Sequence, residues 1–178
     1  GLLLPRHARY RGDHTALVVG SQRLTYQQLN AVVNRLAHAL LDAGLKKGDK
    51  FATVLPNCLE SMTAYWAAAK TGLVIVPLSP LLQDTGLTTL LRDSDTGLVF
   101  GDTAFVDTFD RIRGNLGAIP DDGYILVGDP SSRPGYRTYA SFVTGASADD
   151  PADPGLDDED TYNIMYSSGT TGLPKGIV

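Results

Sequence analysis

Hydrophobic and polar positions along the chain repeat with two periods. Apolar residues at Leu29, Val32, Val33, Leu36 and Leu40 recur every three or four positions, which predicts one buried face of an amphipathic helix. Residues 51–55 predict a strand instead, and residues 73–76 form a continuous apolar run, typical of a strand that is covered on both faces. Helical and strand patterns therefore follow one another.

Local signals add detail to this pattern. Residues 16–19 and 23–25 flank a Gly-Ser turn, which predicts a hairpin, and Thr25 with Gln28 predicts a capping box at the start of the first helix. Asn57 and Glu60 repeat the capping pattern before a second helix that ends at Gly72. The predicted buried side of this helix consists of Leu59, Met62, Tyr65, Trp66 and Ala69. Further helices are expected at 82–91, 104–112 and 139–143, and further strands at 98–100 and 124–127.

Alternating helices and strands indicate an α/β fold with a largely parallel sheet flanked by helices. The length of 178 residues favours a single α/β domain over residues 1–178. Residues 144–160 are rich in Gly, Pro and Asp and are expected to form an internal, exposed acidic linker.

The charge is distributed unevenly. The net charge is −5, yet residues 148–160 carry seven acids, so the remaining chain holds 13 acids against 15 Lys and Arg. No concentrated basic face is apparent, which argues against nucleic-acid binding, and Arg6, Arg9 and Arg11 are expected to form a solvated edge. No apolar run approaches the roughly 20 residues of a transmembrane helix.

Cysteine and histidine offer little chemistry. Cys58 is the only cysteine, so no internal disulfide forms, and a reducing, cytoplasmic compartment fits. A small buried hydrophobe is favoured for Cys58 over a reactive thiolate at a helix start. His7, His14 and His38 share no metal-ligand spacing.

The most informative stretch is 166–178, with the sequence YSSGTTGLPKGIV. A short apolar segment, 162–166, precedes it and is expected to be a buried strand; a second strand is expected at 177–178. Between them, glycines let the backbone approach a ligand, backbone N–H groups and hydroxyls donate, and Lys175 adds a positive charge. These are properties of a polyphosphate-binding loop. The NTPase P-loop is excluded, because its lysine is followed by Ser or Thr whereas Lys175 is followed by Gly176 and Ile177.

This stretch resembles the signature of the adenylate-forming, AMP-binding superfamily, which includes acyl- and aryl-CoA ligases, luciferases and peptide-synthetase adenylation domains. The match to Tyr/Thr-Ser-Gly-Thr-Thr-Gly-x-Pro-Lys-Gly is in register from Ser168 to Gly176. The order of the preceding elements is also similar, from about Thr15 onward, and is weakest between residues 101 and 153. The resemblance implies the N-terminal part of the large domain of such an enzyme. The start without Met and the stop just after the motif suggest a fragment.

The resemblance implies activation of a carboxylic acid with ATP to an acyl-adenylate, followed by transfer to coenzyme A. The nucleotide-binding positions implied are Ser167, Ser168, Gly169, Thr170, Thr171, Gly172 and Lys175. Lys175 is the implied catalytic residue, acting on the departing pyrophosphate, and Thr170 is expected near Mg²⁺. The family's later motifs lie beyond Val178, so the chain alone is expected to be inactive.

The acid itself is not specified. Amino-acid-activating relatives usually have Pro-Leu-Asp-Pro where this chain has residues 77–80, Pro-Leu-Ser-Pro, which favours acyl- or aryl-CoA ligases. A fatty acid is the preferred substrate and an aryl acid of the coumarate or benzoate type the alternative. Two readings from other classes remain, a non-catalytic phosphate-binding or nucleotide-binding α/β module and a purely structural α/β domain. The sequence leaves the oligomeric state open.

Overall fold

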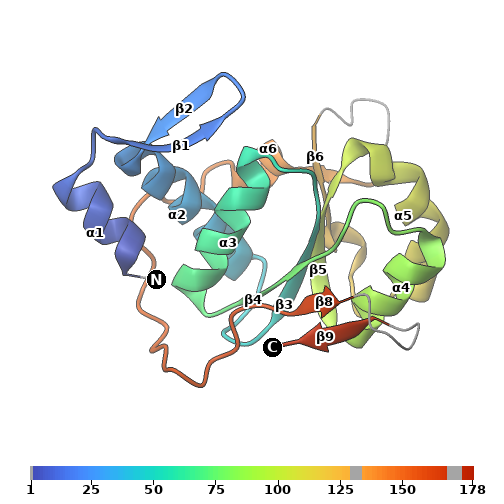
Figure 1. Cartoon of the computed structure of the whole chain (residues 1–178). Coiled ribbons are helices and arrows are strands. Elements are labelled where there is room, and N and C mark those ends of the chain that lie inside the picture. The colour runs from blue at the N-terminus through green and yellow to red at the C-terminus, as the bar shows by residue number, and fades with distance from the viewer. Residues whose placement is uncertain (1, 129–133, 168–173) are drawn as a thin grey trace.

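The computed structural model describes residues 2–128, 134–167 and 174–178, and a five-stranded parallel sheet lies at its centre (Figure 1). The strand order is β4-β3-β5-β6-β7, and every neighbouring pair is parallel. The strands are β3 (Lys50–Val54), β4 (Val74–Pro77), β5 (Thr96–Asp102), β6 (Tyr124–Val127) and β7 (Arg137–Thr138). The predicted α/β class with a largely parallel sheet is confirmed.

Successive side chains of a strand point to opposite faces of the sheet, and in these strands both sets are mostly apolar. Helices therefore cover both faces. Phe51, Ile75 and Phe100 pack against one layer of helices. Ala52, Val76 and Val99 pack against the other layer. The first layer comprises α2 (Tyr26–Asp42), α3 (Leu59–Thr71) and α6 (Tyr139–Val143), and the second comprises α4 (Asp84–Asp93) and α5 (Val106–Ile112). Three 3-10 turns, Thr103–Phe105, Arg113–Asn115 and Asp121–Gly123, join strands and helices around the second layer.

The predicted start of the first long helix is confirmed. A hairpin of β1 (Thr15–Val19) and β2 (Gln22–Thr25) leads directly into α2. The Thr25 hydroxyl accepts from the backbone N–H of Gln28 at 3.2 Å, and the Gln28 side chain accepts from the N–H of Thr25 at 2.9 Å. This capping box fixes the point at which strand becomes helix.

The predicted cap of α3 is wrong by one residue. Cys58, not Asn57, is the N-cap, and its Sγ accepts from the backbone N–H of Ser61 at 3.4 Å. Burial raises the pKa of the Cys58 thiol, so the neutral form is favoured over a thiolate. The thiol therefore has a structural role as a cap, although Cys58 is only partly buried and not the buried hydrophobe predicted from the sequence.

The predicted buried face of α3 is also wrong. Its buried residues are mostly small, namely Thr63, Ala64, Ala67, Ala68 and Thr71 beside the long Lys70, whereas Met62 is 40% exposed. Small side chains let α3 lie close to the sheet and to α2, which leaves the larger side chains at the margins of the contact. A prediction from hydrophobicity alone chose the wrong face of α3, because such a prediction gives alanine too little weight.

Two elements were not predicted. Helix α1 (Leu3–Tyr10) buries only Leu4 completely. A single buried position gives no helical repeat, so the hydrophobic pattern of the sequence did not predict this helix. Strand β7 has two residues and pairs with β6 through Ile125 and Leu126. Helix α4 begins two residues later than predicted, at Asp84.

Residues 144–160, which we call the acidic segment, run along the surface and are tied down at several points. The Asn34 side chain donates to the carbonyl of Ala148 at 2.7 Å. Lys47 Nζ lies 2.6 Å from a carboxylate oxygen of Asp160 and donates to the carbonyl of Gly155 at 2.8 Å. The segment is mostly exposed, as predicted, but its acids make specific contacts with α2, α3 and the turn before β3.

Lys70, a buried lysine of α3, makes the most buried of the contacts that hold the acidic segment. Its Nζ donates to Asn30 Oδ1 at 2.7 Å, Asn34 Oδ1 at 2.6 Å and Asp150 Oδ1 at 2.5 Å, which uses all three ammonium protons. Burial lowers the pKa of Lys70. Burial of Asp150 acts to raise its pKa, but hydrogen bonds from Lys70 and Asn30 outweigh this and lower it. A charge this deep is tolerated because every proton has an acceptor.

We expect Lys70→Met to lower the free energy of unfolding by about 1–3 kcal/mol, because it leaves the buried Asn34 oxygen without a donor. Urea unfolding of the chain measures the change. Lys46→Met, in an exposed turn, is the matched control and should change the value by less than about 0.5 kcal/mol. Equal losses in the two variants would contradict the structural role of Lys70.

Tyr124 carries an unusual buried hydroxyl. The residue is 1% exposed, and its hydroxyl has no hydrogen-bond partner among the described residues. Burial raises the pKa of Tyr124 to about 12. The guanidinium carbon of Arg113 lies 4.8 Å from the centre of the ring, so the ring contributes packing and a cation–π contact that a phenylalanine can also make.

Tyr124→Phe is therefore expected to stabilise the fold by about 1 kcal/mol at neutral pH, because it removes an unpaired polar group. In the unfolded chain tyrosine ionises near pH 10 and in the fold near pH 12, so wild-type stability falls between these values. Thermal melts across this range should show a smaller alkaline loss in the variant. The exposed Tyr10→Phe serves as control, and an identical pH profile in wild type and Tyr124→Phe contradicts this account.

Candidate functional site

The motif singled out in the sequence forms the stem of an antiparallel hairpin, β8 (Met165–Ser167) and β9 (Lys175–Ile177). The hairpin lies beside the edge strand β4 (Figure 1). The N–H of Ile75 donates to the carbonyl of Tyr162 at 3.2 Å, and the N–H of Ile164 donates to the carbonyl of Ile75 at 3.0 Å. This bridge is parallel, so β8 continues in the direction of the carboxyl ends of the sheet strands, where ligands of open α/β sheets bind.

Two of the predicted site residues, Ser167 and Lys175, are described, and the hairpin brings them together. They form the cross-strand pair at the end of the stem, and both are exposed. Residues directly opposite in an antiparallel pair have side chains on the same face. Ser168, Gly169, Thr170, Thr171 and Gly172 lie outside the described residues, so their predicted roles stay predictions.

The stem is held by Tyr166, a residue that the sequence pattern marked only as part of a strand. Its hydroxyl donates to a carboxylate oxygen of Asp93 at 2.6 Å and lies 3.5 Å from the carbonyl of Leu90, both in α4. Burial, and then the hydrogen bond to Asp93, raise the pKa of Tyr166 above its ordinary value. The phenol therefore remains a neutral donor throughout the physiological range.

Gly176 is opposite Tyr166 in the stem, and its lack of a side chain lets the ring lie against it. A Cβ atom at this position would lie 3.0 Å from Cγ2 of Ile164 and 3.3 Å from Cε1 of Tyr166. Both distances are shorter than ordinary van der Waals contact. A side chain at the last glycine of the motif would therefore have to displace Ile164 or the Tyr166 ring by a few tenths of an ångström.

The predicted burial of the motif strand is wrong. β8 has three residues, Met165 is 46% exposed, Tyr162 is 42% exposed and Ile177 is 56% exposed. One face of the stem packs on α4 through Tyr166, and none of the described residues covers the other. An apolar run alone did not distinguish a strand with one covered face from one with two.

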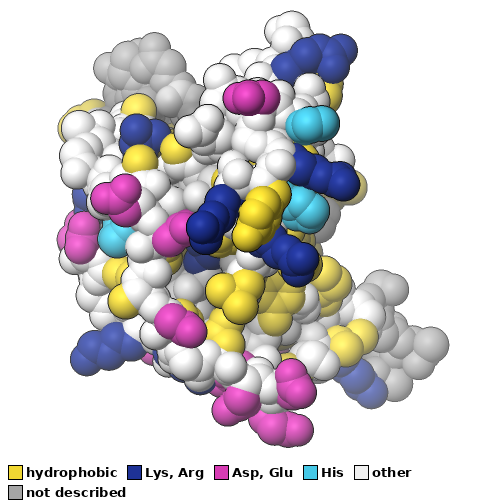
Figure 2. All heavy atoms as spheres, turned by 90° about the vertical axis from the view of Figure 1, so that its left-hand side faces the viewer, with side chains coloured by type: hydrophobic (Ala, Val, Ile, Leu, Met, Phe, Trp, Pro, Cys, Tyr) yellow, Lys and Arg dark blue, Asp and Glu magenta, His cyan; other side chains and the backbone are white. Residues whose placement is uncertain are grey.

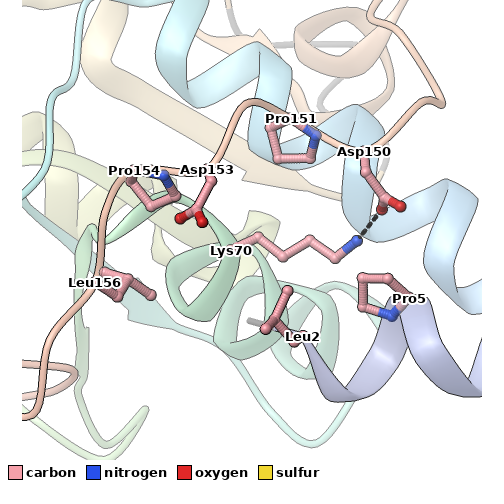
Figure 3. Close-up of a pocket in the computed structure, with 8 residues that line it drawn as sticks. All are labelled: Leu2, Pro5, Lys70, Asp150, Pro151, Asp153, Pro154 and Leu156. Carbon is pink, nitrogen blue, oxygen red and sulfur yellow. Dashed lines mark hydrogen bonds and ion pairs between the residues drawn. The ribbon is translucent and has the colours of Figure 1, made fainter.

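A cavity of about 420 Å³ lies away from the hairpin (Figure 3). It is bounded by α1, by Lys70 and by the acidic segment, and Figure 3 shows the Lys70 ammonium directed at Asp150. It is lined by Leu2, Pro5, Lys70, Asp150, Pro151, Asp153, Pro154 and Leu156. Because the three protons of Lys70 are already used, the described residues that line the cavity offer no free cation to an anionic ligand.

Metal binding and membrane spanning find no support in the described ranges. Within residues 2–128, 134–167 and 174–178, no group of three or more His, Cys, Asp or Glu is arranged to hold a metal ion. Over the same ranges, no helix combines the length and apolarity required to cross a bilayer. Thr170, the predicted neighbour of Mg²⁺, is not among these residues.

A family model described as AMP-binding enzyme matches residues 4–178. The chain belongs to this family. The match covers nearly all of the sequence, including the motif hairpin and the parallel sheet beside it. Membership confirms the resemblance inferred from residues 166–178.

Three proteins to which the chain is similar are named as CoA ligases. Long-chain-fatty-acid–CoA ligase FadD13 of Mycobacterium tuberculosis is 36% identical over 156 residues, covering 88% of this chain and 29% of the relative. Crotonobetaine/carnitine–CoA ligase of Salmonella enteritidis is 30% identical over 173 residues, covering 94% and 33%. The crystal structure of the anthranilate CoA ligase AuaEII with anthranoyl-AMP superposes with a TM-score of 0.90 at 26% identity, covering 98% of this chain and 33% of that one. The chain spans about a third of the length of these relatives.

Tyr166→Phe is expected to loosen the hairpin by about 1 kcal/mol, the value of an ordinary hydrogen bond and below that of one to a buried charge, because Asp93 is exposed. The backbone amides of β8 and β9 should then exchange with solvent roughly five-fold faster. Tyr10→Phe, which removes a hydroxyl from an exposed ring, should leave their exchange unchanged. Unchanged exchange in Tyr166→Phe would show that the ring, and not the hydroxyl, holds the stem.

Proposed function

We propose that the protein is an ATP-dependent acid–CoA ligase, in which the motif hairpin binds the polyphosphate of ATP. The reaction proposed is activation of a carboxylic acid to an acyl-adenylate, followed by formation of a CoA thioester. The observation that carries the proposal is the pairing of Ser167 with Lys175, which places a hydroxyl and the lysine of the motif on one exposed face. Membership of the AMP-binding family supports the same chemistry.

The chemistry proposed for these residues is positioning and charge stabilisation. The carboxylate of the acid attacks the α-phosphorus of ATP. The bond between the α-phosphorus and the oxygen that bridges it to the β-phosphate breaks, and pyrophosphate leaves with the electron pair of that bond. Negative charge accumulates on pyrophosphate in this step, and the Lys175 ammonium gains interaction energy as it does so. Ser167 contributes a neutral hydroxyl donor beside it. Both exposed side chains are accessible to a ligand as large as ATP.

Further parts of the proposal concern residues that the structure does not describe. Ser168, Gly169, Thr170, Thr171 and Gly172 are proposed to hold the β- and γ-phosphates, with Thr170 near the Mg²⁺ that accompanies ATP. No step is assigned to the metal, because the described residues offer no cluster of ligands for it.

We propose a fatty acid as the substrate. The support is FadD13, whose name specifies long-chain fatty acids and which is 36% identical. An aryl acid is the second candidate, because the anthranilate CoA ligase superposes with a TM-score of 0.90. We also propose that residues 1–178 form one α/β unit that needs the remaining two thirds of a typical relative for catalysis, and that the protein works in the cytoplasm.

The decisive test is the kinetics of Lys175→Ala in the complete protein, measured by ATP–pyrophosphate exchange with a panel of fatty and aryl acids. Loss of a donor aimed at developing charge lowers kcat about 10²–10³-fold, with a smaller change in KM for ATP. Lys46→Ala, an exposed lysine in the turn before β3, is the matched control. Exchange with fatty acids alone would support the preferred substrate.

The alternative is purely electrostatic attraction of ATP by Lys175. In that case kcat stays constant, KM rises, and the effect fades as salt is added. That result would refute the role in the transition state. Absence of exchange with every acid, combined with binding of ATP, would favour the non-catalytic nucleotide-binding module instead.

A further inference from the structure

Helix α1 presents one face to solvent that mixes apolar and basic side chains. This outward face consists of Leu3, Arg6, Arg9 and Tyr10, which lie on one side of the helix. Leu3 is 64% exposed and Tyr10 is 72% exposed, and Leu2, just before the helix, is 81% exposed. Large apolar side chains with this much exposure next to arginines point to a surface with a partner.

The opposite face of α1 fixes the helix to the protein. Leu4 is 1% exposed, and the His7 ring lies against the ring of Tyr26, with the centroids 5.0 Å apart. After the helix, the carbonyl of Gly12 accepts from the N–H of Gln27 at 3.1 Å. Because these contacts hold the helix against α2, its outward face has a defined orientation.

The charge of this region is opposite to that of the whole chain. Residues 2–25 contain four arginines and one acid, whereas the chain carries a net charge of −5. None of the ion pairs between described residues involves Arg6, Arg9 or Arg11. Figure 2 views the side of the molecule on which α1 lies and shows Lys and Arg side chains gathered around hydrophobic ones, with most acids of this view toward its left and lower edges.

We propose that the outward face of α1 binds the surface of an anionic lipid bilayer. Leucine and tyrosine side chains fit the boundary between headgroups and acyl chains, and guanidinium groups pair with the phosphates above it. The guanidinium carbon of Arg9 lies 5.7 Å from the centre of the Tyr10 ring, so the cationic and apolar groups are adjacent. With eight residues in the helix, the contact is peripheral and reversible. It goes beyond the proposed ligase function and needs no part of it.

The test is sedimentation of the complete protein with vesicles of phosphatidylcholine, alone or mixed with phosphatidylglycerol. Binding is expected only to the anionic vesicles and should weaken between ~0.01 M and ~1 M salt, as the Debye length falls from ~30 to ~3 Å. Arg6→Gln and Arg9→Gln should each lower the partition coefficient roughly five-fold. Leu3→Ser and Tyr10→Ser should lower it several-fold and leave its salt dependence unchanged.

Lys46→Gln is the matched control, because it removes one exposed charge near the opposite end of α2, roughly 22 Å along the helix from Gln27. It should bind like the wild type. Three results would overturn the proposal: no binding to anionic vesicles, arginine variants that bind as well as wild type, or an equal loss in Lys46→Gln. Since vesicle binding is measured without substrate, failure of the ligase assay leaves this test unaffected.

Discussion

A parallel sheet must bury both of its faces, and this requirement organises the chain. Each strand contributes alternate side chains to two cores, one containing Phe51 and Phe100 and the other Val76 and Val99. Every helix that follows a strand then covers one of these cores. Full burial of a large side chain contributes about 1.5–3 kcal/mol, so the two layers together outweigh any polar contact on the surface. The motif hairpin depends on this framework, because the described part of its backbone is joined to the sheet at Ile75 in the edge strand.

The candidate site is positioned by contacts that are individually modest. Two backbone hydrogen bonds at Ile75, the Tyr166 phenol on α4 and the close approach at Gly176 define where the stem lies. None of them involves the side chains of Ser167 or Lys175. Ser167 and Lys175, the two described residues proposed to bind phosphate, take no part in these contacts, whereas their neighbours Tyr166 and Gly176 do.

Much of the fold could be predicted from the sequence, because its dominant signals are local. The period of α2, the capping box at Thr25 and the strand at 124–127 all depend on residues close in sequence. The failures have a different origin. The buried face of α3 depends on how closely the helix approaches α2. The cap at Cys58 depends on the position of one sulfur atom relative to a backbone N–H, and α1 is too short to show a helical repeat of apolar residues. At the site, the motif located Ser167 and Lys175, but the anchoring of Tyr166 to Asp93 joins positions 73 residues apart and leaves no local trace.

The long-range contacts that hold the acidic segment have a consequence for the order in which the chain folds. Asn34 meets Ala148 across 114 positions, and Lys70 meets Asp150 across 80. Closing loops of this length costs entropy before the contacts form, so such contacts are made late. On the ribosome, α2 and α3 emerge well before the residues that satisfy their buried lysine. The nascent chain must therefore carry Lys70 without its carboxylate until residue 150 has been made, and the motif hairpin follows only after that.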